Sequence, residues 1–119
     1  DALAAIALTV DTSALTAIAN DYSFDRIFRR QIAALGDKGD VFIGISTSGQ
    51  SKNVIEAVEE ASEMGIKTIG FTGKAGGALG DLVDICIKVP SRRVGVIQQV
   101  HITLGHILCS IVESEFGRK

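Results

Sequence analysis

The residues best suited to chemistry stand in one short stretch, residues 44–51, which follows an apolar segment and opens a helical pattern. Four of its side chains carry hydroxyl groups: Ser46, Thr47, Ser48 and Ser51. Hydroxyls beside the free N–H groups and positive dipole end of a helix favour the binding of an oxyanion such as phosphate. Gln50 stands where a Walker A loop carries lysine, which disfavours a nucleoside triphosphate and leaves a sugar monophosphate. A serine-rich turn in which Ser51 caps the helix is the alternative explanation.

A second group of polar residues lies on the last helical pattern, residues 94–115. At about 100° per residue, Gln98, His101 and His106 fall on a polar side, apart from an apolar side that we expect to face the core. The expected core side is formed by Ile97, Leu104, Ile107, Leu108 and Ile111. Imidazole and amide groups can bind a divalent metal, and His106 could serve instead as a general acid or base. Two ligands do not complete a zinc site, and structural histidines are the alternative.

Other positions have simpler structural explanations. Asn20 and Asp21 follow a helical pattern, where turn and capping chemistry selects the same residue types. The glycine-rich stretch 72–77 could bind an anion, but a flexible connector explains it adequately. Cys86 and Cys109 sit among apolar residues, so we expect small buried side chains in a reducing compartment.

The hydrophobic pattern predicts the elements that must position these residues. Continuous apolar segments, typical of strands buried on both faces, occupy residues 4–10, 41–46, 67–72 and 84–89. Helical patterns alternate with them at residues 12–19, 24–35, 51–64, 78–83 and 94–115. This alternation predicts an α/β fold, a three-layer sandwich around a parallel sheet, with ligands beyond the carboxyl ends of the strands.

Size and composition limit the possible classes of function. The 119 residues suffice for one compact domain or part of one, and 46% hydrophobic residues can form a core. A net charge of −2 without a basic stripe argues against direct binding of nucleic acid. The longest apolar run, residues 2–8, is far below the roughly 20 residues that span a bilayer, and it lacks the basic flank of a signal peptide. We therefore expect a soluble protein without a membrane partner.

Taken together, several motifs resemble the phosphoheptose isomerase family, whose members are built on a sugar isomerase (SIS) domain. The motifs follow the family order along the whole chain, at residues 7–11, 19–22, 44–51, 71–74 and 97–106. The resemblance implies a SIS fold with flavodoxin-like or Rossmann-like topology. It also implies conversion of D-sedoheptulose 7-phosphate to D-glycero-D-manno-heptose 7-phosphate, a step toward the heptose of the lipopolysaccharide core.

The resemblance further implies roles for individual residues. The phosphate would be held by Ser46, Thr47, Ser48 and Ser51. Asn20 and Asp21 would contact the sugar. Gln98 would touch the substrate and bind a zinc ion together with His106, which is also the expected catalytic residue. A cytoplasmic homotetramer with active sites at the subunit interfaces is implied as well.

The chain resembles only the C-terminal portion of these enzymes, so residues 1–119 are predicted to form a partial SIS domain. The family's N-terminal helices, first strand and glycine-rich loop, with a zinc-binding histidine and a catalytic glutamate, have no counterpart in this sequence. We therefore expect these residues alone to be inactive. Two alternatives to an isomerase are a non-catalytic SIS protein that binds a replication initiator and a sensor of sugar phosphates. Ser48 and His106 favour the isomerase, because the initiator-binding relatives differ at both positions.

Overall fold

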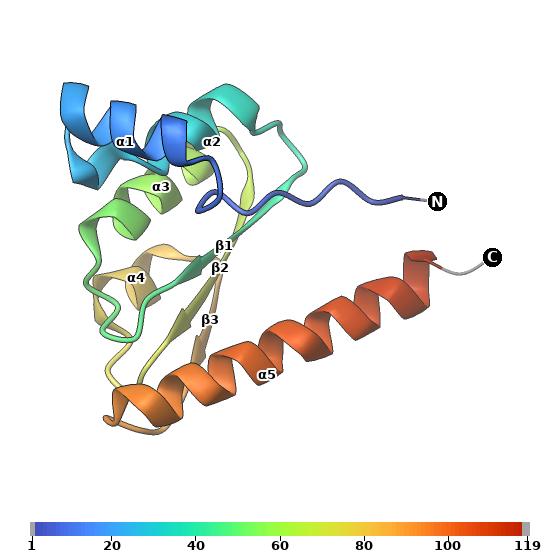
Figure 1. Cartoon of the computed structure of the whole chain (residues 1–119). Helices are drawn as coiled ribbons and strands as arrows, with labels where there is room; N and C mark the ends of the chain where they lie inside the picture. The colour runs from blue at the N-terminus through green and yellow to red at the C-terminus, as the bar shows by residue number, and fades with distance from the viewer. Residues whose placement is uncertain (1, 118–119) are drawn as a thin grey trace.

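The computed structural model describes residues 2–117 as alternating helices and strands (Figure 1). In chain order the elements are α1 (Thr12–Asp21), the 3₁₀ turn η1 (Phe24–Arg26), α2 (Arg29–Leu35), β1 (Val41–Ile45), α3 (Lys52–Glu63), β2 (Lys67–Thr72), α4 (Gly77–Leu82), β3 (Ile85–Lys88), α5 (Val94–Val112) and the π-helical turn η2 (Glu113–Gly117). The three strands predicted after residue 40 are confirmed to within one residue at each end.

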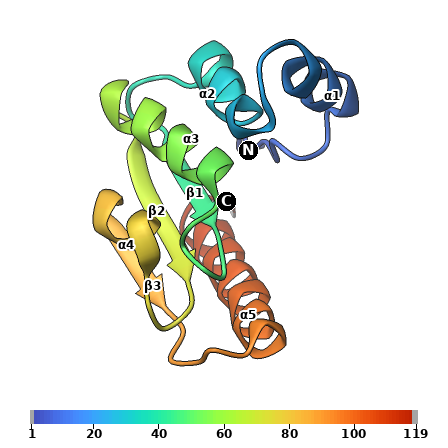
Figure 2. The ribbon, with the colours of Figure 1, turned by 90° about the vertical axis from the view of Figure 1, so that its left-hand side faces the viewer.

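The strands form one parallel sheet in the order β1-β2-β3. Val41 of β1 lies opposite Lys67 of β2, and Ile69 of β2 lies opposite Ile85 of β3. Figure 1 shows α2, α3 and α4 on one side of the sheet and α5 on the other. Turned by 90°, the ribbon places the start of α5 at the same end of the sheet as the loops that follow β1 and β2 (Figure 2). The predicted α/β fold with a parallel sheet is confirmed.

Helix α3 is fixed by a buried face at helical spacing. Its buried residues are Val54, Ala57, Val58 and Ala61. Val54 and Val58 pack with Leu79 of α4, whereas Ala57 and Ala61 pack with Ile32 of α2. On its outer side, Glu60 pairs with Arg29 of α2 at 2.8 Å. Because α3 is held on both flanks, the loop that leads into it from β1 has a fixed end.

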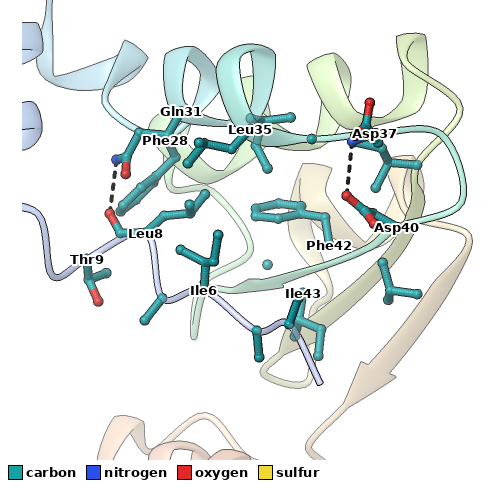
Figure 3. A pocket seen from close by; sticks show the side chains of 18 of the residues that line it. Ile6, Leu8, Thr9, Phe28, Gln31, Leu35, Asp37, Asp40, Phe42 and Ile43 are labelled. Carbon is teal, nitrogen blue, oxygen red and sulfur yellow. Dashed lines mark hydrogen bonds between the residues drawn. The ribbon is translucent and has the colours of Figure 1, made fainter. Parts of the chain in front are cut away.

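The predicted strand over residues 4–10 is wrong. These residues form an irregular segment, and Gln31 of α2 anchors it by donating a hydrogen bond from Nε2 to the Leu8 carbonyl oxygen at 3.0 Å. A cavity of about 960 Å³ lies between this segment, β1 and α2, with Ile6, Phe42 and Ile43 on its walls (Figure 3). A strand needs a neighbouring edge for its backbone hydrogen bonds, and this segment, which lies across the cavity from β1, pairs with no strand. An apolar pattern carries no information about that neighbour.

Two smaller predictions are also corrected. The helical pattern 24–35 is interrupted at Ile27 and Phe28, between η1 and α2. Both residues keep helical dihedral angles, Ile27 at φ −59° and ψ −36° and Phe28 at φ −90° and ψ −40°, so the break is a change from 3₁₀ to α-helical hydrogen bonding rather than a turn of the chain. Cys109 is exposed rather than buried, because this part of α5 has left the sheet, and Cys86 is half-buried.

Helix α5 leans away from the sheet after its first turns (Figure 1). Its buried residues are Ile97 and His101, whereas Ile107 and Ile111, both expected in the core, are half exposed. With the turn that follows, it forms a helix over Val94–Phe116 that is long and apolar enough to cross a membrane, judged by length and composition only. The amphipathic pattern identified the helix correctly but not how much of it the rest of the chain covers.

Asp84 joins the start of β3 to β2. Its Oδ2 accepts hydrogen bonds from the backbone N–H of Thr68 at 2.8 Å and from Thr68 Oγ1 at 3.1 Å. Lys67 Nζ lies 3.4 Å from the other carboxylate oxygen. The backbone hydrogen bond, followed by the side-chain bond from the same threonine, lowers the pKa of Asp84 below its ordinary value.

Replacement of Asp84 by asparagine should lower the melting temperature at pH 7 by a few degrees. A carboxyl whose pKa falls on folding stabilises the folded state above its unfolded pKa of about 3.9, and this contribution is lost as the pH falls through the lower folded value. Thermal melts at pH 7 and pH 3 should therefore show a smaller acid-induced drop in melting temperature for Asp84→Asn than for the unsubstituted protein. Asp81→Asn, at an exposed carboxylate of α4, is the control. Identical pH dependence of the Asp84 variant and the unsubstituted protein would contradict the assignment.

Candidate functional site

Residues 46–51, which we call the hydroxyl loop, follow the carboxyl end of β1, and three of their hydroxyl groups lie together. Ser46 Oγ lies 2.9 Å from Ser51 Oγ and 3.5 Å from Ser48 Oγ. The loop closes on itself, since the backbone N–H of Gly49 donates to Ser46 Oγ and that of Gln50 donates to Ser48 Oγ, both at 3.1 Å. Ser46 is buried, whereas Ser48 is exposed. The loop therefore has a fixed inner hydroxyl and an outer one that a ligand can reach.

The residue at the start of α3 does not cap the helix with its side chain. Ser51 occupies the cap position, but its hydroxyl bonds to Ser46 Oγ and makes no capping hydrogen bond. The alternative explanation of this stretch, in which the Ser51 side chain caps the helix, is thus not the observed arrangement. The Val54 N–H donates to Asn53 Oδ1 at 2.9 Å, whereas within residues 2–117 the N–H groups of Lys52 and Asn53 make no hydrogen bond. These two amides keep their capacity to donate, and the helix dipole favours an anion beside them. The hydroxyl loop and these amides together suit a phosphate group.

Gly49 and the stretch 72–77 lie in contact. Gly49 has φ +67°, and a Cβ at this position would lie 1.8 Å from the carbonyl oxygen of Gly76. Leu79 of α4 donates its N–H to the Gly49 carbonyl at 3.0 Å, and Gly73 donates to the Thr47 carbonyl at 3.0 Å. The stretch that we expected to be a flexible connector is therefore a support for the hydroxyl loop. Paired glycines at 76 and 77 are the sequence feature that could have indicated such a close backbone approach.

Gln98 and His106 both lie exposed on α5. Within residues 2–117 neither side chain makes a hydrogen bond, so both are available to a ligand. They are eight positions apart, which is about 12 Å along a helix axis at 1.5 Å per residue. No group of three or more His, Cys, Asp or Glu side chains in this part of the chain is arranged to hold a metal ion. An amide oxygen and an imidazole are suitable donors for zinc, but they supply at most half of a tetrahedral site.

His101 does not lie on the polar side of α5, contrary to the sequence prediction. Its side chain is 5% exposed, its ring packs against Phe71, and Nε2 lies 3.1 Å from the Thr72 carbonyl oxygen. The alternative of a structural histidine is therefore correct for this residue. The helical projection failed because α5 contacts the sheet along a narrow line through Ile97 and His101 rather than along its most apolar side.

Asn20 and Asp21 make no hydrogen bond to the hydroxyl loop within residues 2–117. They end α1, both are exposed, and Asn20 Nδ2 donates to Asp21 Oδ1 at 2.9 Å. None of the hydrogen bonds among residues 2–117 connects this pair to the hydroxyl loop or to α5. Of the residues predicted for the site, the structure thus brings together the hydroxyl groups of Ser46, Ser48 and Ser51. Thr47 is adjacent in the loop, and Gln98 and His106 lie on α5.

Comparison with known proteins gives a consistent set of relatives. The SIS domain family model matches residues 2–73. The chain is 59% identical over 114 residues to the phosphoheptose isomerase of a Nitratiruptor species, a match that covers 96% of this chain and 61% of that protein. It is 56% identical to phosphoheptose isomerase 2 of Campylobacter jejuni subsp. jejuni, and that match covers 98% of this chain and 58% of that protein.

A solved structure shares the fold. Phosphoheptose isomerase GmhA from Neisseria gonorrhoeae superposes with a TM-score of 0.92 at 51% identity, over 94% of this chain and 62% of that one. The chain therefore spans about three fifths of the length of the relatives that it matches.

Proposed function

Because the chain belongs to the SIS domain family, we propose that the protein is an aldose–ketose isomerase in which the hydroxyl loop binds the phosphate of the substrate. The substrate is D-sedoheptulose 7-phosphate and the product is D-glycero-D-manno-heptose 7-phosphate, in keeping with the names of its relatives. The reaction would take place in the cytoplasm and supply heptose for the lipopolysaccharide core.

The observation that carries this proposal is the hydroxyl loop itself. Three of its hydroxyl groups converge in a loop without lysine, and the Ser51 side chain does not cap the adjacent helix. Several hydroxyl and amide donors around one phosphate suit a monophosphate, whereas a triphosphate normally requires a lysine and a metal at the same loop. A phosphate held here would act as a non-reacting handle that orients the sugar carbons toward α5.

The chemistry moves a proton between C1 and C2 of the sugar. This step needs a base, an acid and donors for a developing oxyanion. His106 is the catalytic residue that we assign to proton transfer, because an imidazole exchanges protons near neutral pH. Asn20 and Asp21 are assigned to the sugar hydroxyls, which their exposed amide and carboxylate groups suit.

Zinc is the proposed cofactor, with Gln98 and His106 as two of its ligands. When bound, the ion would polarise the substrate carbonyl and hydroxyl oxygens. The two donors fit zinc in type but not in number, so its other ligands must come from outside residues 2–117 or from another copy of the chain. A homotetramer with active sites at subunit interfaces would bring such residues to α5, much of which is exposed. Residues 1–119 alone would then be inactive.

The test is turnover of sedoheptulose 7-phosphate by the full-length protein, with Ser48→Ala as the diagnostic variant. A hydrogen bond to a charged group is typically worth about 1.5–3 kcal/mol, so loss of this exposed outer hydroxyl should raise KM by roughly 10- to 100-fold. Ser62→Ala, at an exposed serine near the end of α3, should leave KM unchanged. Ligand-dependent stabilisation without product would identify a sensor instead, and binding of a replication initiator without turnover would reject the isomerase.

A further inference from the structure

His101 is a buried polar residue of α5 that the proposed chemistry does not use. A carbonyl oxygen can only accept a hydrogen bond, so the contact of His101 Nε2 with the Thr72 carbonyl requires a proton on Nε2. The same oxygen accepts the backbone N–H of Val89 at 3.0 Å. Helix α5, the end of β2 and the residue after β3 therefore meet at a single carbonyl group.

The other ring nitrogen indicates that packing alone does not account for a histidine here. Among residues 2–117, the buried Nδ1 of His101 has no hydrogen-bond partner. Leucine would fill the space beside Phe71 without leaving a buried nitrogen unpaired, and an unpaired buried acceptor is unfavourable. The feature of histidine that the structure uses is the N–H donor at Nε2.

The acceptor of this hydrogen bond belongs to the segment that supports the hydroxyl loop. Gly73 follows Thr72 directly and donates its N–H to the Thr47 carbonyl at 3.0 Å. A Cβ on Gly73 would lie 2.7 Å from both the Thr47 carbonyl oxygen and Ile97 Cδ1 of α5. The loop, the end of β2 and the helix thus pack directly against one another at Gly73.

We propose that His101 is a positioning residue: by holding the Thr72 carbonyl, it fixes the start of α5 relative to the hydroxyl loop. The proposal rests on the proposed function in one respect, that the hydroxyl loop holds the phosphate while Gln98 and His106 act at the other end of the substrate. A fixed spacing between these groups then decides whether a bound sugar reaches the reacting groups. Displacement by about 1 Å can cost about 100-fold in rate.

Kinetics of the full-length protein provide the first test. His101→Leu should lower kcat by roughly 10- to 100-fold, while KM and the affinity for inorganic phosphate change less than about 3-fold, because the hydrogen bonds of the hydroxyl loop are internal to it. His101→Gln retains an N–H donor and should recover most of the lost kcat. Ile97→Val is the matched control. It shortens the other buried side chain of α5 and leaves the hydrogen bond of His101 intact, so its kcat should stay near that of the unsubstituted protein.

Nuclear magnetic resonance supplies a second test that does not depend on isomerase activity. Nitrogen-15 spectra of labelled histidine should show His101 protonated at Nε2, and inorganic phosphate should shift the amide signals at the start of α5. The His101→Leu variant should lose that phosphate response, and the glutamine variant should keep it. If the protein turns over no sugar phosphate but shows these responses, the proposed function fails while the positioning role stands.

Three results would overturn the inference. One is a proton-free Nε2 in the folded protein. Another is an unchanged kcat in His101→Leu. The third is that the leucine and glutamine variants lose kcat equally and in proportion to their loss of thermal stability. Should the leucine variant fail to fold, the tautomer of His101 and the glutamine variant still decide the question.

Discussion

His106→Ala in the full-length protein is expected to lower kcat by about 10²- to 10⁴-fold, the range that a positioned acid–base group contributes. The side chain is exposed on α5 and makes no hydrogen bond within residues 2–117, so its removal should leave the melting temperature nearly unchanged. The substitution leaves the proposed phosphate contacts of the hydroxyl loop intact, so KM should change much less than kcat. If His106 also binds zinc, the metal content of the purified variant should fall.

Steady-state kinetics, elemental analysis and thermal melts together check this result. Ser110→Ala, at an exposed residue of α5 beside the same shallow groove as His106, is the matched control and should behave as the unsubstituted protein. A variant lacking the imidazole that turns over substrate normally would remove His106 from the mechanism. Normal metal content with lost activity would keep the proton-transfer role and reject the ligand role.

Gly49→Ala is expected to lower kcat/KM by about 100-fold or more and to reduce thermal stability. The backbone at Gly49 has φ +67°, a region that residues with a Cβ adopt at a cost of roughly 1–2 kcal/mol. In addition, the new methyl group would lie 1.8 Å from the Gly76 carbonyl oxygen, so two backbone segments must separate. The hydroxyl loop would move when its backbone separates from that of Gly76, and the donors around the phosphate would no longer converge.

Gly39→Ala separates the effect of a positive φ from the effect of losing the close contact with Gly76. Gly39 also has a positive φ, +103°, but a Cβ there would meet no atom within 4 Å, and the residue precedes β1 at the opposite end from the hydroxyl loop. We expect this control to lower the melting temperature without raising KM. Phosphate titrations of both variants, followed by calorimetry, measure the difference directly. Equal phosphate affinity in Gly49→Ala and the unsubstituted protein would show that the loop does not need this close contact.

Local chemistry made part of the fold and site predictable. The strand 67–72 and the helix after Ser51 follow from unbroken periodic patterns ended by glycine, and such patterns depend little on distant residues. The convergence of hydroxyls in residues 46–51 was predictable for the same reason, since they are neighbours in one tight loop between a strand and a helix. Residues 4–10 have an equally apolar pattern, but a strand also needs a partner edge, which lies beyond the reach of a local pattern.

The sequence by itself determined which residue types stand at the end of β1 and along α5, because the order of hydroxyls, glycines and histidines is a property of the chain. Only the tertiary structure decided that Gly76 supports Gly49 and that His101 points inward to Thr72 while His106 stays exposed. A helix has the same periodicity whichever side it presents to a sheet. The side that is buried depends on the contacts of its first turns with segments far along the chain, and these contacts form only when the strands have assembled.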